Sequence, residues 1–189
     1  MSYGWFIPVI VAVSFSLTWA LRCYALSRSL MDIPNARSSH TIPTPRGGGV
    51  AIVLAFTLAL FMLLFAGLME IPVFLAIAGA GAMVAVIGFM DDHGHIAARW
   101  RLLGHFGASL WLLFWLGGLP VVELAGATFD LGWFGHTLAV LYLVWLLNLY
   151  NFMDGIDGIA SVEAICVCLG AALLYWVGGT LDLVWAPLL

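Results

Sequence analysis

The sequence predicts an all-α, polytopic membrane protein with about six transmembrane helices. Of its 189 residues, 64% are hydrophobic and only 8% are charged, whereas about a quarter of the residues of a soluble domain are charged. The mean hydropathy is +1.11, and the apolar residues gather in long runs. The net charge of −4 is modest, so the composition indicates no nucleic-acid partner.

Six apolar runs have the length of a membrane span, which needs about 20 residues in helical form. The first run carries no charge from Met1 to Leu21 and is too long and too aromatic for a cleaved signal peptide. The predicted spans cover residues of about 4–26, 48–69, 71–90, 102–119, 136–153 and 161–179.

The arginines predict the orientation of these spans, because cytoplasmic loops collect basic residues. The first connection, about 27–47, and the third, about 91–101, hold five of the six arginines. The second and fourth connections hold acidic residues and no arginine. We therefore expect a periplasmic N-terminus, with cytoplasmic loops at about 27–47, 91–101 and 154–160 of a single transmembrane domain over residues 1–189.

The third span contains a run of small residues, AIAGAGAMVA, from Ala76 to Ala85. Small residues let the backbones of membrane helices approach closely. We expect this run to form a helix-packing face, with a substrate groove as the weaker alternative.

The second cytoplasmic loop reads GFMDDHGHIAARWR and contains the adjacent pair Asp91 and Asp92. Two neighbouring carboxylates repel each other unless a cation or a proton lies between them. The pair therefore indicates a site for a hard cation or a general base, with a solvated helix end as the alternative. The His-x-His that follows is weak evidence for zinc, and Arg99 and Arg101 are expected to anchor the membrane interface, with phosphate contact as a second role.

The third cytoplasmic loop lies in NLYNFMDGIDGIAS, where Asn148, Asn151, Asp154 and Asp157 recur every three residues. Residues three apart share one face of a helix. The glycine after each aspartate predicts that the helix turns there and that backbone N–H groups are open to an anion. Magnesium prefers carboxylates together with substrate phosphates, so the pattern indicates a site for a metal-bound phosphate. A solvated turn is the alternative.

The first loop reads DIPNARSSHTIPTPRGGG. Its prolines stiffen the chain and its glycines allow close approach of a ligand or a helix. Arg37, His40 and Arg46 are candidate phosphate contacts, although the loop taken alone is also an ordinary linker. His105 and His136, at the starts of the fourth and fifth spans, are expected to have packing or interface roles.

Together, DIPNARSSHTIPTPRGGG, GFMDD and NLYNFMDGIDG resemble the polyprenyl-phosphate N-acetylhexosamine-1-phosphate transferases of bacterial envelopes. DGIDG alone is weak evidence, but three motifs in order on one face are specific. The RxxHxxPxPRGGG form is similar to the branch that starts O-antigen, common-antigen or teichoic-acid linkers.

The resemblance implies a multi-pass protein of the bacterial inner membrane that transfers a sugar-1-phosphate from a UDP-N-acetylhexosamine to undecaprenyl phosphate and releases UMP. It implies Mg²⁺ as cofactor, with Mn²⁺ as an alternative, and leaves a homodimer open. The resemblance also implies roles for the residues of the three loops. Asp91 and Asp92 would hold the metal or deprotonate the lipid phosphate, and Asp154 and Asp157 would complete the acidic site, with Asp154 as a metal ligand. Asn148 and Asn151 would orient substrate or metal-bound water, and the substrate would be contacted by Arg37, His40 and Arg46.

Members of this family continue past a sixth span, with a further aspartate in an MGD-type motif and a histidine-rich HxHH-type loop. This chain carries neither. The expectation is that it corresponds to an N-terminal portion and is an incomplete catalyst alone.

Other classes of protein fit less well. A CDP-alcohol phosphatidyltransferase also uses DxxDG, but there an Ala-Arg pair and later acidic residues follow, and here the sequence continues as IASVEAICVCLG. A transporter or proton pathway predicts acidic residues near mid-span, and these lie at span ends. An inactive structural fragment is the third alternative.

Overall fold

The computed structural model describes residues 3–29, 31–32, 43–45, 47–94, 96–124, 127–153, 158–179, 184 and 187. Within these ranges, the side chains of residues 3, 31–32, 92–94 and 122–124 are not described. All structural statements below concern this part of the chain.

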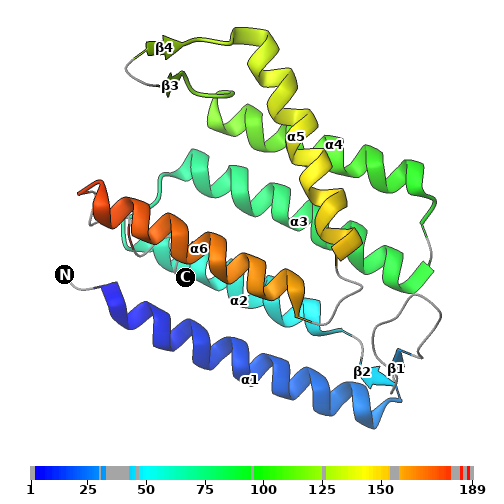
Figure 1. The fold of residues 1–189 in the computed structure, drawn as a ribbon. Helices are drawn as coiled ribbons and strands as arrows, with labels where there is room; N and C mark the ends of the chain where they lie inside the picture. The colour runs from blue at the N-terminus through cyan, green and yellow to red at the C-terminus, as the bar shows by residue number, and fades with distance from the viewer. Residues whose placement is uncertain are drawn as a thin grey trace. The chain divides into compact units, whose positions relative to one another are not determined.

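Six long helices form, each close to a predicted span, and a single turn of 3₁₀-helix (Tyr3–Trp5) precedes the first (Figure 1). The helices are α1 (Phe6–Ser27), α2 (Gly48–Phe65), α3 (Ile71–Gly94), α4 (Ala98–Leu116), α5 (Gly132–Met153) and α6 (Ile159–Val177). The predicted all-α, polytopic fold is thereby confirmed.

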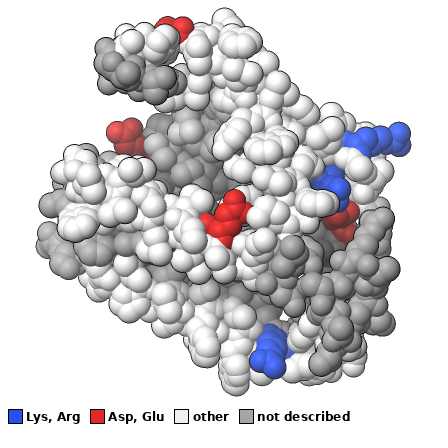
Figure 2. All heavy atoms as spheres, in the orientation of Figure 1, with Lys and Arg blue, Asp and Glu red and all other residues white. Residues whose placement is uncertain are grey.

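Five of these helices are long and apolar enough to cross a membrane: α1, α2, residues Ile71–Asp91 of α3, α5 and α6. The sixth, α4, has 19 residues but carries Arg99, Arg101 and His105 in its first half, which makes it the least apolar. Many large apolar side chains are exposed, such as Phe65 at 84%, and Figure 2 shows few charged side chains on a largely uncharged face. Because exposed apolar surface of this extent suits lipid rather than water, the chain is a multi-pass membrane protein.

The chain groups into two compact units, one of residues Met1–Leu68 with Asn151–Leu189 and one of Met69–Tyr150. In the first unit, α1 and α2 run antiparallel and pack together. Ala51, Ala55 and Ala59 are buried at a spacing of four residues along α2. This stripe of small side chains gives α2 a smooth face against which a neighbouring helix can lie closely. The prediction of one transmembrane domain stays a prediction.

A short ribbon joins α1 to α2. Strand β1 (Met31–Asp32) pairs antiparallel with β2 (Thr44–Pro45), with Met31 opposite Pro45 and Asp32 opposite Thr44. Gly47, which precedes α2, has a φ of 97°, a left-handed conformation that glycine adopts without strain. The ribbon therefore brings together the two ends of the predicted first loop.

In the second unit, α3 and α4 form a tightly packed antiparallel pair. A side chain at Gly79 would collide with the Trp111 indole, and one at Gly104 would collide with Ile87. The Trp111 Nε1 donates a hydrogen bond to the Leu75 carbonyl, at 2.9 Å. The predicted packing face is confirmed at Ala76, which is fully buried, and at Gly79.

A second ribbon, which the sequence reasoning did not predict, lies in the connection 120–135. Strand β3 (Val122–Leu124) pairs antiparallel with β4 (Ala127–Phe129), and α5 begins at Gly132, four residues earlier than expected. His136 Nδ1 accepts the Leu119 N–H at 3.0 Å, so the predicted packing role of His136 is confirmed. The α3–α4 connection and the β3–β4 ribbon lie at opposite ends of α4 (Figure 1).

The glycines of α3 give a matched test of this packing. Gly79→Ala is expected to lower the thermal unfolding midpoint in detergent, because its methyl group meets an indole that a hydrogen bond holds in place, at a cost of about 1–3 kcal/mol. Gly81→Ala, on the same helix with open space around it, is expected to hold or raise the midpoint, since alanine favours helix. Equal midpoints for the two variants would contradict the packing.

The two ends of α4 also test the predicted orientation. With Cys23, Cys166 and Cys168 replaced by serine, Thr128→Cys on β4 is expected to react with a membrane-impermeant maleimide in intact cells. Ala98→Cys is expected to react only after lysis, because its end of α4 carries the arginines. Both positions are exposed. The reverse pattern of labelling would invert the orientation.

Candidate functional site

The described residues include part of the predicted site. Asp91, Asn148 and Asn151 are placed, as are Arg101 and His105. The side chain of Asp92 and the whole of Arg37, His40, Arg46, Asp154 and Asp157 lie outside the described residues.

Asp91 lies in the last turn of α3, which continues to Gly94 rather than ending at residue 90. Its two oxygens have different partners. Oδ1 accepts the backbone N–H of Ile96 at 3.0 Å, and Oδ2 accepts from Arg101 Nη1, also at 3.0 Å. Both side chains of this ion pair are 28% exposed. Asp91 thus stabilises the turn between α3 and α4 and ties it to the first turn of α4.

Asn148 lies near the end of α5 and contacts α4. Its Nδ2 donates to the Val144 carbonyl at 2.7 Å and lies 3.4 Å from His105 Nδ1. Because the amide nitrogen can only donate, this contact is a hydrogen bond in the His105 tautomer whose Nδ1 accepts. His105 is only 5% exposed, so its predicted packing role is confirmed, and the contact with Asn148 is an addition.

One face of α4 therefore carries a line of polar groups that no motif predicted. Arg101, His105 and Ser109 follow at intervals of four residues, which places them on the same face. The Ser109 hydroxyl donates to the His105 carbonyl at 2.8 Å. The spacing R-x-x-x-H-x-x-x-S is readable in the sequence, but its partners on α3 and α5 are not.

The bounds of the last two helices agree with the predicted connection at about 154–160, of which residues 154–157 lie outside the described residues. α5 ends at Met153 and α6 begins at Ile159. Gly158 immediately before α6 has a φ of 79°, which favours glycine at that position. Asn151 is exposed one turn beyond Asn148. Farther along α6, Glu163 Oε2 is buried and has no hydrogen-bond partner among the described residues.

The described residues do not fit a metal ion by themselves. Among them, no group of three or more His, Cys, Asp or Glu side chains is arranged to hold one. Asp91, the described member of the predicted ligand set, has both oxygens engaged by Ile96 and Arg101. The metal prediction therefore depends on Asp92 and Asp154, whose side chains lie outside the described part of the chain.

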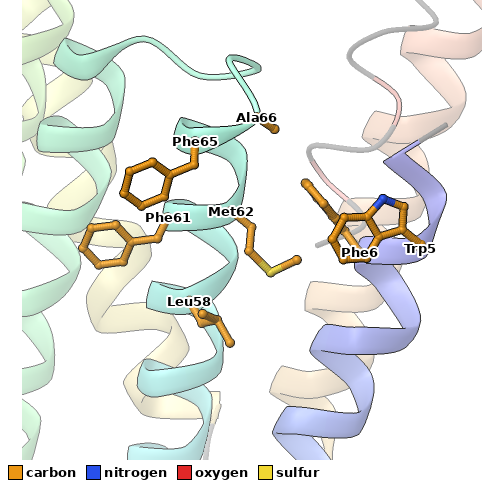
Figure 3. Close-up of a pocket in the computed structure, with 7 residues that line it drawn as sticks. All are labelled: Trp5, Phe6, Leu58, Phe61, Met62, Phe65 and Ala66. Carbon is orange, nitrogen blue, oxygen red and sulfur yellow. The ribbon is translucent and has the colours of Figure 1, made fainter. Parts of the chain in front are cut away.

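An apolar pocket in the first unit is a different kind of feature. It has a volume of about 480 Å³ and lies between the start of α1 and the end of α2 (Figure 3). Its lining consists of apolar side chains only: Trp5, Phe6, Leu58, Phe61, Met62, Phe65 and Ala66. The pocket has no charged group that could recognise a phosphate, and it lies at the other end of α1 from the β1–β2 ribbon. It is therefore no candidate for a nucleotide site.

Comparison with known proteins identifies the family. The model of glycosyl transferase family 4 matches residues 71–189. This is more than half of the chain and includes the GFMDD and NLYNFMDGIDG motifs. The chain belongs to this family.

Curated relatives agree with the family. The chain is 28% identical over 165 residues to a probable undecaprenyl-phosphate N-acetylglucosaminyl 1-phosphate transferase of Bacillus subtilis, covering 82% of this chain and 45% of the relative. It is 27% identical to a decaprenyl-phosphate N-acetylglucosaminephosphotransferase of Mycobacterium tuberculosis, with coverage of 83% and 42%. It is 25% identical to a phospho-N-acetylmuramoyl-pentapeptide-transferase of Streptococcus pneumoniae, with coverage of 74% and 46%.

The chain spans about half the length of the curated relatives that it matches. No solved structure matches it. Membership in glycosyl transferase family 4 separates the chain from the CDP-alcohol phosphatidyltransferases, with which it shares only DxxDG, and disfavours a transporter.

Proposed function

We propose that this chain forms part of an enzyme that transfers an N-acetylhexosamine-1-phosphate from a UDP-sugar to undecaprenyl phosphate. The observation that carries this proposal is the presence of GFMDD and NLYNFMDGIDG, at the ends of α3 and α5, in a chain of glycosyl transferase family 4. The names of the relatives, which describe N-acetylglucosamine phosphotransferases that act on undecaprenyl or decaprenyl phosphate, support it.

The reaction exchanges one phosphoanhydride bond for another. An oxygen of the lipid phosphate attacks the phosphorus on the sugar side of the UDP-sugar and forms the new P–O–P bond. The bond between that phosphorus and the bridging oxygen of the nucleotide pyrophosphate breaks, and UMP leaves with the electron pair. The sugar C1–O bond stays intact, so we expect retained anomeric configuration and a reaction that is nearly thermoneutral.

The protein's task in such a transfer is positioning and charge neutralisation. Asn148 and Asn151, one turn apart at the end of α5, are proposed to orient the substrate. Arg37, His40 and Arg46 are proposed to contact its phosphates, since arginine pairs well with phosphate oxygens. Asp91, Asp92, Asp154 and Asp157 are proposed as the acidic side of the site. A bacterial inner membrane supplies the lipid substrate at the face where these motifs end.

The sugar is proposed to be N-acetylglucosamine or a close relative, because two of the relatives carry N-acetylglucosamine in their names. The product would start a lipid-linked envelope glycan such as O-antigen.

Release of UMP tests the function. Membranes that carry the product of the complete reading frame, supplied with undecaprenyl phosphate and Mg²⁺, are expected to release UMP from at least one UDP-N-acetylhexosamine. Asp154→Asn is expected to lower the rate at least a hundredfold, because it removes a charge that the phosphoryl transfer needs. Asp130→Asn is the matched control, since Asp130 is an exposed carboxylate on the β3–β4 side that accepts the Gly132 N–H.

The same assay decides between the alternatives. Equal loss in both variants, with both inserted normally, would contradict a catalytic role for Asp154. Absence of UMP with every sugar tested would overturn the transferase proposal and favour an inactive structural protein. Residues 1–189 alone, assayed beside the complete frame, show whether this part of the sequence is sufficient.

We also propose that the reaction requires Mg²⁺, with Mn²⁺ as a substitute, because hard cations prefer carboxylate and phosphate oxygens. A bound divalent cation would neutralise pyrophosphate charge. Treatment with EDTA is expected to abolish UMP release, and excess Mg²⁺ or Mn²⁺ is expected to restore it. Full activity in EDTA would contradict the metal requirement and leave the transfer itself standing.

A further inference from the structure

The polar face of α4 joins the two motifs that lie in the second unit. Asp91 belongs to GFMDD on α3, and Asn148 belongs to NLYNFMDGIDG on α5. Among the described residues, no hydrogen bond or ion pair joins these two side chains. Both instead contact α4, Asp91 through Arg101 at 3.0 Å and Asn148 through His105 at 3.4 Å.

We propose that Arg101 and His105 are positioning residues, which hold Asp91 and Asn148 at a fixed spacing from one face of α4. The proposal rests on the proposed function, since it gives Asp91 and Asn148 their place in the transferase site. Arg101 and His105 are one turn apart, or about 6 Å along the helix axis at 1.5 Å per residue.

The ion pair between Asp91 and Arg101 lies beside a point where α3 and α4 pack closely. Gly104 lacks the side chain that would collide with Ile87. Ile87 lies one turn before Asp91 on α3, and Gly104 lies three residues after Arg101 on α4. The antiparallel pair therefore packs closely beside the ion pair of Asp91 and Arg101.

The second contact is one of two that α5 makes with α4 and the residues after it, one near each end of α5. His136 near its start accepts the N–H of Leu119, which follows α4. Asn148 near its end contacts His105 within α4. The Asn148 amide nitrogen therefore has two partners, the Val144 carbonyl on its own helix at 2.7 Å and His105 on α4 at 3.4 Å, and His105 is the partner that relates it to α4.

The ion pair also fixes the direction of the Asp91 carboxylate. Each of its oxygens accepts one hydrogen bond, from the Ile96 N–H and from Arg101, and keeps a further lone pair. Asp91 therefore holds the α3–α4 turn while its carboxylate stays available to the acidic side of the proposed site.

Double-mutant cycles distinguish positioning from simple helix packing. His105→Leu removes the acceptor for Asn148 and is expected to lower kcat/KM for the UDP-sugar about three- to tenfold, which is the worth of one hydrogen bond. In an Asn148→Ala background the same change is expected to cost less than twofold further, because His105 acts through Asn148. Arg101→Gln is expected to behave in the same way in an Asp91→Asn background.

Two matched variants sharpen this test. His105→Gln, whose amide oxygen can accept in place of Nδ1, is expected to recover at least half of the loss. Ser109→Ala, on the same buried face one turn away, removes only a hydrogen bond within α4 and is expected to stay within twofold of the parent. Losses that multiply in the double variants, or an equal loss in Ser109→Ala, would overturn the positioning role.

Thiol cross-linking tests the geometry without any activity. In a background with Cys23, Cys166 and Cys168 replaced by serine, the pair His105→Cys with Asn148→Cys is expected to be joined by a short bifunctional thiol reagent, as measured by mass spectrometry. The pair Ser109→Cys with Asn148→Cys, one turn farther apart, is the control and is expected to stay open. Failure of the first pair to join in folded protein would overturn the proposal.

The two experiments separate this proposal from the proposed function. An active parent with multiplying losses overturns the positioning role alone. A parent that releases no UMP with any sugar, but whose first cysteine pair joins, keeps the tie between α4 and α5 and overturns both the transferase function and the positioning role that rests on it.

Discussion

A polar group placed among apolar membrane helices has to find its partner within the protein, because lipid offers none. The second unit is built around this constraint. α4 carries an arginine, a histidine and a serine on one face, and each has a protein partner: Asp91 for Arg101, Asn148 for His105 and the helix's own backbone for Ser109. Two of these contacts leave α4, one to the last turn of α3 and one to the end of α5.

Small residues make these polar contacts reachable. An ion pair between two helices needs their axes close together, and glycine allows the closest approach. Gly104 admits Ile87 and Gly79 admits Trp111, while the Trp111 N–H finds the Leu75 carbonyl across the same interface. Packing and polar pairing therefore support each other along α3 and α4.

The sequence predicts the helices well and their mutual contacts poorly. Hydropathy places six helices within a few residues, and Gly158 marks the start of α6, because apolar length and glycine conformation are local properties. Asp91 and Arg101 lie at the apolar minimum between two spans and therefore look like loop residues, although both lie in helices that continue to Gly94 and begin at Ala98. Which face each helix turns to its neighbour depends on tertiary packing, so the tie between His105 and Asn148 and the ribbon of β3 with β4 were not foreseen.

The arrangement also suggests how α4, which carries no recognised motif, acts on α5, which carries one. In the positioning proposal, the buried imidazole of His105 on α4 acts on the end of α5 through the amide of Asn148. The motif residue Asn148 then depends on a histidine that belongs to no motif, because the contact between them arises from tertiary packing.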